Sequence, residues 1–372
     1  MVRKQNKKNS SCPCCQSGKP YGKCCRKKVL LLKKARRQQD VREKLIKSFE
    51  ENHGNVRIPY KMKAYGKNLI SIGGEILEQT HTGEYNFNNL IHDYALVFFG
   101  EEFLMKQNSI QKEERHQAIK WMHSFLEDSN TKKKGHSGLG AAWLRLAYDI
   151  YTIGAEPRLK QKMKDKLIKQ NFFQGKRQEL WAAAWFITAG FDVEFVDEEA
   201  SDDKEPEFIA TDTKSKAVIA VEVKSRQRKG VLGFSGGLDK DPGEEVNIEK
   251  LLKKAYKKEK GIPLCVVIDT NLPPESNNFG IEYWSSEIER TIDKLARTGY
   301  ENPCPANILF FYNDPSHYLE SELFGKEKDS IWINSYIPSQ PKNNCSHVDD
   351  YKKRLFKAQK QRACPPIEIP KI

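Results

Sequence analysis

Helix-type and strand-type segments alternate in a definite order between residues 175 and 275, and this order limits the fold more than any other sequence feature. The helical pattern KRQELWAAAWFITAG ends at Gly190 and precedes three strand-type segments, FDVEFV, PEFIATD and KAVIAVEVK. A basic amphipathic segment, VNIEKLLKKAYKKEK, then precedes a buried strand pattern, IPLCVVID. An α-β-β-β-α-β order with one crossover helix is typical of an α/β domain.

The third strand-type segment, Lys216–Arg226, carries charges where a buried strand is expected to be apolar. Its valine, isoleucine and alanine residues suit a buried sheet, yet Glu222 and Lys224 lie within it or at its end. A carboxylate and an ammonium group on a core strand cost free energy unless they are paired or bind a ligand. The segment therefore indicates either a functional site or a row of ion pairs on an exposed sheet face.

A hairpin between PEFIATD and KAVIAVEVK would bring a second carboxylate to Glu222. With the turn centred between Lys214 and Ser215, Glu207 lies directly opposite Glu222. Lys224 then points to the same face of the sheet, because side chains two residues apart on a strand share a face. Two facing carboxylates repel each other and do not both stay ionised without a cation.

These groups suit the hydrolysis of a phosphodiester. Glu207 and Glu222 offer the oxygen ligands that Mg²⁺ or Mn²⁺ prefers, and such an ion keeps waters for chemistry. Lys224 can orient an attacking water or stabilise charge that develops on a phosphate. Glu179, early on the preceding helix, reaches the same place if that helix packs against the hairpin. We therefore expect these four residues to be catalytic.

The sequence GKRQELWAAAWFITAGFDVEFV…EPEFIATD…AVIAVEVKSR resembles the PD-(D/E)xK nuclease superfamily over about residues 175–275. The resemblance implies a restriction-endonuclease-like core and a metal-dependent nuclease. Pro206-Glu207 stands at the family's "PD" position, with glutamate in place of the usual aspartate. Glu222-Val223-Lys224 stands at "(D/E)xK", and Glu179 stands where many members have a helical glutamate. The helix at 246–260 would flank the substrate channel, and its candidate phosphate contacts are Lys250, Lys253 and Lys254.

Five of the nine cysteines lie within Cys12–Cys25, in the segment CPCCQSGKPYGKCC. Disulfides are unexpected in a large, cytosolic chain, so the cluster indicates a metal site. Two close cysteines, a glycine-containing loop and two adjacent cysteines can supply four thiolates to a tetrahedral zinc ion. The segment resembles the SEC-C motif, which implies a structural or docking zinc module. The expected ligands are Cys12, Cys14, Cys24 and Cys25, with Cys15 as the alternative to Cys14.

All of the net charge of +13 lies in the first 50 residues, which hold 16 lysines and arginines and three acids. Such a basic arm indicates nucleic acid, the ribosome or another polyanion as a partner; the alternative is a lysine-rich tail that aids solubility. After Cys25 the spacing of apolar residues favours a helix with a basic face. We expect Arg36 and Arg37 on this helix to contact nucleic acid.

The rest of the chain completes the expected organisation. Short strand-type pieces such as NLISIGG precede a helical region at 86–172, where Trp121, Trp143 and Tyr148 suit a core. The expected divisions are a SEC-C-like zinc module at 1–28, a basic linker helix at 29–53, a mostly helical domain at 54–172, a nuclease-like domain at 173–335 and a polar, partly disordered tail at 336–372. No apolar segment of about 18 residues occurs, and no apolar segment follows the charged N-terminus. We therefore expect a cytoplasmic protein without a membrane span.

Three functions are compatible with these features. The first is a metal-dependent nuclease acting on DNA or RNA, with the zinc module and basic arm recruiting substrate or a protein partner. The second is a nucleic-acid-binding protein on a catalytically degenerate nuclease fold, and the third is an adaptor that acts through the zinc module. Since many nucleases cut two strands by pairing, a homodimer is a further possible arrangement.

Overall fold

The computed structural model describes the greater part of the chain from residue 60 onwards. The described residues are 60–64, 67–72, 75–78, 86–131, 135–154, 157–196, 205–228, 231–232, 248–273, 281–297, 303–319 and 331–363, together with Lys33, Asp40 and Lys44. The expectations for the cysteine cluster and for Arg36 and Arg37 lie outside these residues. Residues His53–Ile369 form one compact unit.

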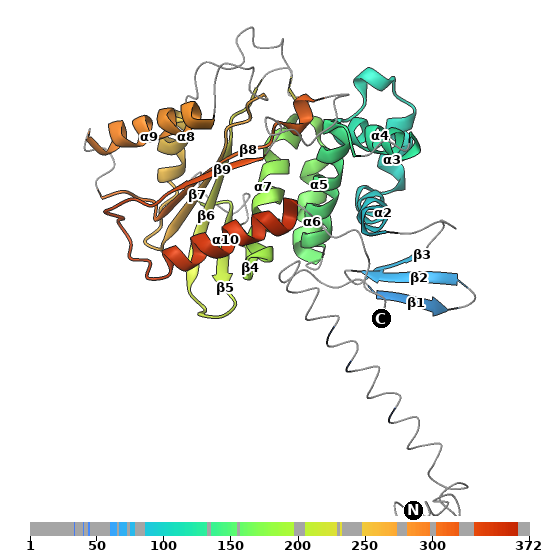
Figure 1. Cartoon of the computed structure of the whole chain (residues 1–372), viewed down its shortest axis with the longest axis horizontal. Helices are drawn as coiled ribbons and strands as arrows, with labels where there is room; N and C mark the ends of the chain where they lie inside the picture. Colours follow the sequence, from blue (N-terminus) through green and yellow to red (C-terminus); the bar gives the residue numbers. More distant parts are fainter. Residues whose placement is uncertain are drawn as a thin grey trace, which may run out of the picture. The chain divides into compact units, whose positions relative to one another are not determined.

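A six-stranded mixed sheet forms the centre of the α/β part (Figure 1). Its order is β4-β5-β6-β7-β8-β9; β6, β7 and β8 are parallel, and the remaining neighbours are antiparallel. The strands are β4 (Phe191–Phe195), β5 (Phe208–Asp212), β6 (Val218–Ser225), β7 (Leu264–Asp269), β8 (Ile308–Asn313) and β9 (Trp332–Tyr336). With α7 (Gln170–Thr188) before β4 and α8 (Glu249–Tyr256) before β7, the expected α-β-β-β-α-β order is confirmed.

The register of the β5–β6 hairpin is also confirmed. Phe208 pairs with Val221, and the same register continued by one residue places Glu207 opposite Glu222. The side chain of Asp212 fixes the turn, because its carboxylate accepts hydrogen bonds from the Lys214 backbone amide at 3.2 Å and the Ser215 hydroxyl at 2.6 Å. This local pattern, in which an aspartate bonds to the chain just beyond it, sets the register of both strands.

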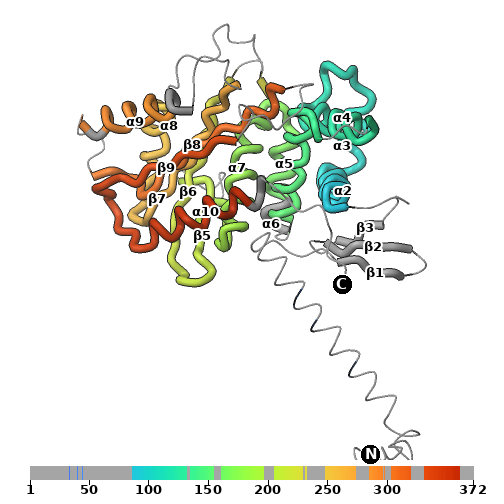
Figure 2. The backbone as a smooth tube through the Cα atoms, viewed as in Figure 1, coloured from blue at the N-terminus to red at the C-terminus, as the bar shows by residue number. Residues whose placement is uncertain are grey.

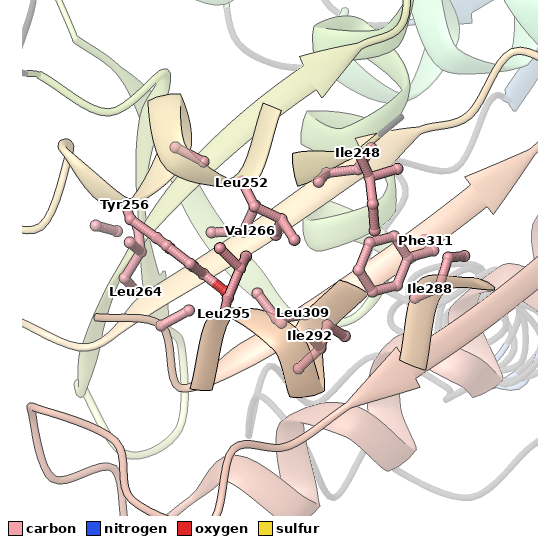
Figure 3. Packing of buried hydrophobic residues seen from close by; sticks show 14 of the residues in the cluster. Ile248, Leu252, Tyr256, Leu264, Val266, Ile288, Ile292, Leu295, Leu309 and Phe311 are labelled. Carbon is pink, nitrogen blue, oxygen red and sulfur yellow. The ribbon is translucent and has the colours of Figure 1, made fainter. Parts of the chain in front are cut away.

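Helices α8 and α9 (Ile281–Arg297) cover one face of the sheet. The apolar side of α8, including Leu252 and Tyr256, packs with alternate residues of the strands such as Val266 and Leu309 (Figure 3). Side chains on this face alternate with those on the other, as the pleat of a strand requires. On β6 the alternation places Ala220 in this core and directs Glu222 and Lys224 to the same face.

Helix α7 covers the opposite face and carries two stacked tryptophans. Trp181 stacks on Tyr312 of β8 with ring centroids 3.9 Å apart, and Trp185 meets Phe310 edge to face at 4.8 Å. α7 ends just before Gly190, whose φ of 92° suits the residue that leaves a helix.

The segment expected to be a polar tail contains helix α10 (Val348–Ala363), which packs on α7. The Trp185 indole N–H donates to the Leu355 carbonyl at 2.6 Å. Arg354 pairs with Asp212 at 3.0 Å, and its guanidinium lies 4.6 Å from the centre of the Phe191 ring. The described part of this segment is therefore an integral layer of the α/β unit.

Helices dominate residues 86–172, as the sequence indicates, and the described segments from α2 to α10 are coloured along the chain in Figure 2. Trp121, Trp143 and Tyr148 are buried, which confirms their expected place in the core. The helices are α2 (Phe87–Phe99), α3 (Glu101–Asn108), α4 (Gln117–Asn130), α5 (Gly138–Ile153) and α6 (Pro157–Leu167), and the short 3-10 turns are η2 (Lys112–Glu114) and η3 (Pro315–Tyr318).

A separate antiparallel sheet precedes these helices, where the sequence shows short strand-type pieces. Its strands are β1 (Tyr60–Ala64), β2 (Lys67–Ile72) and β3 (Glu75–Glu78), paired in chain order. Throughout the described residues, no helix is both long enough and apolar enough to cross a membrane.

Candidate active site

The structure brings three of the four predicted catalytic side chains into direct contact. The Lys224 ammonium group forms an ion pair with the Glu222 carboxylate and lies 3.6 Å from Oε1 of Glu207. Glu222 and Lys224 belong to β6, and Glu207 immediately precedes β5. The expected acid-acid-lysine cluster is therefore present at the point where the two strands run side by side.

Glu179, the fourth predicted residue, comes from α7. Its negative charge helps to raise the pKa of Lys224, although α7 covers the face of the sheet opposite to the one that carries Glu222 and Lys224. Its carboxylate also bonds to Lys176, one turn earlier on the same helix, at 2.7 Å. Lys176 is absent from the set that the motif indicates, although its spacing of three residues from Glu179 is the usual signal for a helical ion pair.

The position of the cluster follows from the strand alternation. Ala220, two residues before Glu222, lies in the apolar core under α8, and Glu222 is the next residue on that face. Glu222 is fully buried, whereas the side chains of Lys224 and Glu207 keep 21% and 17% of their surface exposed. The cluster thus begins where the apolar core ends, and it becomes accessible towards Lys224.

Burial and neighbouring charges alter the ionisation of the cluster. Burial raises the pKa of Glu222 to about 7, and the negative charge of Glu207 acts in the same direction, while the Lys224 ammonium opposes both. Burial lowers the pKa of Lys224, but Glu222 and Glu207 outweigh that effect, and the net shift is upward. Lys224 is therefore protonated at neutral pH. The Glu222 carboxyl, with a pKa of about 7, titrates near neutral pH.

Glu222 makes the stability of the protein depend on pH. Because its pKa rises from the ordinary 4.5 to about 7 on folding, the folded state binds more protons than the unfolded state between these values. The free energy of unfolding therefore falls as the pH rises through this window. The raised pKa of Lys224 adds stability that is lost only as the pH rises above its ordinary value of 10.5, outside the window.

We expect Glu222→Gln to remove the fall in the free energy of unfolding between pH 5 and pH 8. Urea unfolding at pH 5 and pH 8 measures the effect: relative to the wild type, the variant gains stability on going from pH 5 to pH 8. Glu249→Gln is the control, because Glu249 is a half-exposed carboxyl whose pKa is lowered by Lys253 and Lys294. If the free energy of unfolding of Glu222→Gln changed with pH as that of the wild type does, Glu222 would not be the group responsible for the pH dependence.

The predicted phosphate contacts on α8 differ in their surroundings. Lys253 pairs with Glu249 at 2.7 Å, and Glu249 also binds Lys294 at 2.8 Å. The charge of Lys253 is thus offset within the protein, whereas Lys250 and Lys254 are exposed. The sequence pattern alone does not distinguish these lysines, because Lys294 belongs to α9 and meets Glu249 only through the packing of the two helices.

The oxygen ligands of the cluster suit a hard divalent ion. Within the described residues, no group of three or more histidine, cysteine, aspartate or glutamate side chains is arranged as a ready metal cage. Glu207 and Glu222 form a two-carboxylate set, and Mg²⁺ is commonly held by one or two carboxylates together with waters and substrate phosphates. In this structure the Lys224 ammonium supplies the positive charge between them. The donor set is thus compatible with Mg²⁺ or Mn²⁺.

Comparisons with models of known protein families, with curated proteins and with solved structures find no match for this chain. Its class is therefore described from the fold and the site themselves. It is a mixed α/β protein whose strand β6 carries a buried glutamate paired with a half-buried lysine, next to a second carboxylate from the adjoining strand end.

Proposed function

We propose that this chain is a metal-dependent nuclease that hydrolyses phosphodiester bonds in DNA or RNA. The observation that supports it most is the contact of Lys224 with both Glu222 and Glu207. Two carboxylates and an ammonium group at one point provide ligands for a divalent ion and a fixed positive charge for a phosphate. The similarity to PD-(D/E)xK nucleases also supports the proposal, because the elements follow in that family's order.

The proposed mechanism assigns separate tasks to the cluster. Glu207 and Glu222 would hold Mg²⁺ or Mn²⁺, which supplies Lewis acidity towards a phosphoryl oxygen when bound. Lys224 is protonated at neutral pH because its pKa is raised. It therefore stabilises negative charge on the phosphate and donates a hydrogen bond to the attacking water, rather than removing a proton from it. Glu179 would add negative charge from α7, which helps to keep Lys224 protonated.

The residues outside the cluster would supply affinity. Lys250 and Lys254 on the exposed side of α8 are candidate phosphate contacts, and we assign the same role to Arg36 and Arg37 of the basic arm. A zinc module at Cys12, Cys14, Cys24 and Cys25 would dock substrate or a protein partner. Contacts between such cations and phosphates are independent of base sequence and depend on salt.

Cleavage assays on the full chain test this proposal. We expect single- or double-stranded DNA or RNA to be cut in Mg²⁺ or Mn²⁺ and to stay intact in a chelator. Glu222→Gln is the matched inactive variant, because it keeps the shape of the side chain and removes its charge. Intact substrates under every condition, or equal cleavage by the variant, would overturn the proposal.

A second candidate is a nucleic-acid-binding protein without cleavage. The ion pair between Lys224 and Glu222 favours it, since the ammonium group already compensates the buried carboxylate without a metal. Binding that weakens with salt, combined with intact substrates in both Mg²⁺ and Mn²⁺, would distinguish it from the nuclease.

A further inference from the structure

Three exposed lysines follow one face of helix α10. Lys353, Lys357 and Lys360 are spaced by four and then three residues, and residues at this spacing lie on the same side of a helix. All three are exposed, whereas Tyr351 and Leu355 of the same helix are buried. At 1.5 Å per residue the three lysines extend over about 10 Å along the helix axis. The outer face of α10 is therefore a short row of positive charges.

The charge of this row is not offset by neighbouring carboxylates. In the described part of the chain none of the three lysines forms an ion pair. The acids of the described α10 side chains, Asp349 and Asp350, lie in its first turn, and Asp350 pairs with Arg354 at 3.0 Å. The lysine row therefore differs from Lys253 on α8, whose charge Glu249 compensates at 2.7 Å.

The turn between β5 and β6 adds two exposed lysines beside this helix, Lys214 and Lys216. The Asp212 carboxylate joins the turn to α10, because it accepts hydrogen bonds from the Lys214 backbone amide at 3.2 Å and from the Arg354 guanidinium at 3.0 Å. Neither lysine of the turn pairs with a described acid. We name the five residues together the lysine surface: Lys214, Lys216, Lys353, Lys357 and Lys360.

Two simpler roles do not account for the lysine surface. The helix dipole favours a cation near the carboxyl end of α10, such as Lys360, but a cation in the second turn, such as Lys353, gains nothing from it. A helix that lies on a membrane inserts apolar side chains between the lipids. In α10 the apolar residues Tyr351, Leu355 and Ala358 are buried within the protein, so they are not available to a lipid surface.

We propose that the lysine surface binds the phosphate backbone of a nucleic acid, at a place separate from the candidate active site. This inference rests on the proposed nuclease function, because it names a second contact with the same substrate. Lysine ammonium groups are point charges, and they bind phosphates without reading the bases. One strand of a duplex carries a phosphate about every 3.4 Å along its axis, so the row on α10 spans about three phosphates.

The lysine surface and the glutamate–lysine cluster lie towards opposite ends of β6 (Val218–Ser225). Lys216 just precedes the strand, and Lys224 is eight positions further on, near its end. At about 3.3 Å per residue the two positions are about 25 Å apart. A nucleic acid that contacts both places therefore covers about seven or more base pairs. The lysine surface would contribute affinity for long substrates and take no part in the chemical step.

The salt dependence of DNA binding tests the inference. The full-length wild type and the triple variant Lys353→Gln/Lys357→Gln/Lys360→Gln are titrated against a fluorescein-labelled DNA duplex of about 30 base pairs at several NaCl concentrations. A chelator is present, so that cleavage does not interfere. We expect the triple variant to bind about 10- to 100-fold more weakly at low salt, with the slope of log K against log salt shallower by about 2 to 3. Glutamine has nearly the helix propensity of lysine, so the fold is kept.

A second triple variant is the matched control, because it removes the same net charge from exposed cations that already pair with a carboxylate. Its substitutions are Lys112→Gln, Arg290→Gln and Lys342→Gln, and the paired acids are Glu127, Glu287 and Glu259. We expect its slope to stay within about 0.5 of the wild-type slope. Equal slopes for the wild type and the α10 variant, or equal losses in the two triple variants, would overturn the inference.

Cleavage and lipid binding separate the remaining outcomes. In Mg²⁺ the α10 variant should raise KM for the long duplex by about 10-fold and keep kcat within about 2-fold. If the wild type cleaves nothing, the nuclease proposal fails by itself, whereas the binding measured in chelator still decides the role of the lysine surface. Vesicles with phosphatidylserine that bind the wild type better than the α10 variant, while DNA binding is equal, would assign the surface to a membrane and overturn the inference.

Discussion

Replacing Lys224 with methionine is expected to lower kcat for divalent-dependent cleavage by about 100- to 1,000-fold, the usual cost of one charge-stabilising donor. Methionine has a similar length and suits partly buried surroundings, so the change removes the charge and little of the packing. Lys224 lies between Glu222 and Glu207, where a phosphate on the metal would meet it. Single-turnover cleavage at saturating Mg²⁺ measures the effect without a contribution from product release.

Lys254→Met is the matched control for this variant. Lys254 is an exposed lysine on α8, and we expect its loss to weaken substrate binding at low salt while kcat stays within about 2-fold. The Lys224→Met variant also removes the group that lowers the pKa of Glu222, so Glu222 should titrate at a higher pH than in the wild type. Cleavage at the wild-type rate by Lys224→Met would remove Lys224 from the proposed mechanism.

Truncating Leu355 to alanine is expected to lower the free energy of unfolding by about 2–5 kcal/mol, the usual cost for a fully buried leucine. Leu355 is 1% exposed on α10, and its backbone carbonyl accepts the hydrogen bond from Trp185 of α7. The substitution leaves that bond in place and removes only apolar contacts. Urea denaturation gives the change in stability, provided that the dependence of the free energy of unfolding on urea concentration is the same in both variants.

The exposed Lys353 on the same helix supplies the comparison. Lys353→Ala should change the free energy of unfolding by less than about 0.5 kcal/mol, as is usual for surface positions. Equal, small effects of both substitutions would mean that α10 contributes little to the stability of the α/β unit, contrary to its packing against α7.

The local features of the chain are predictable from sequence because they depend on near neighbours. The nearly continuous apolar run Val218–Val223 predicts a buried strand, and the helical spacing around Trp181 and Trp185 predicts α7. The turn near Lys214 sets the β5–β6 register, so the meeting of Glu207 with Glu222 and Lys224 follows from residues that lie within 20 positions of one another. The acid-acid-lysine cluster therefore follows from the sequence alone.

Contacts between distant segments are not predictable in the same way. Helix α10 has a mostly polar sequence, and only its packing on α7 shows that Tyr351 and Leu355 are buried. The pairing of Glu249 with Lys294 spans 45 residues, and it changes which lysines of α8 keep an uncompensated charge. The Glu249–Lys294 contact leaves no periodic signal in the chain. The apolar residues of α10 do recur at helical spacing, at Val348, Tyr351, Leu355 and Ala358, but this spacing does not show that the helix packs on α7.

The sequence by itself determined the order of the elements, the hairpin register and the candidate catalytic groups, because short-range periodicity and turn chemistry decide these. The tertiary structure alone decided how α7 faces β6. Arg177 of α7 and Asp269 of β7, which are 92 residues apart, meet only when the helix packs on the sheet. Burial of Glu222 on the sheet face that α8 covers raises its pKa to about 7, and desolvation of this kind arises only from the assembled fold.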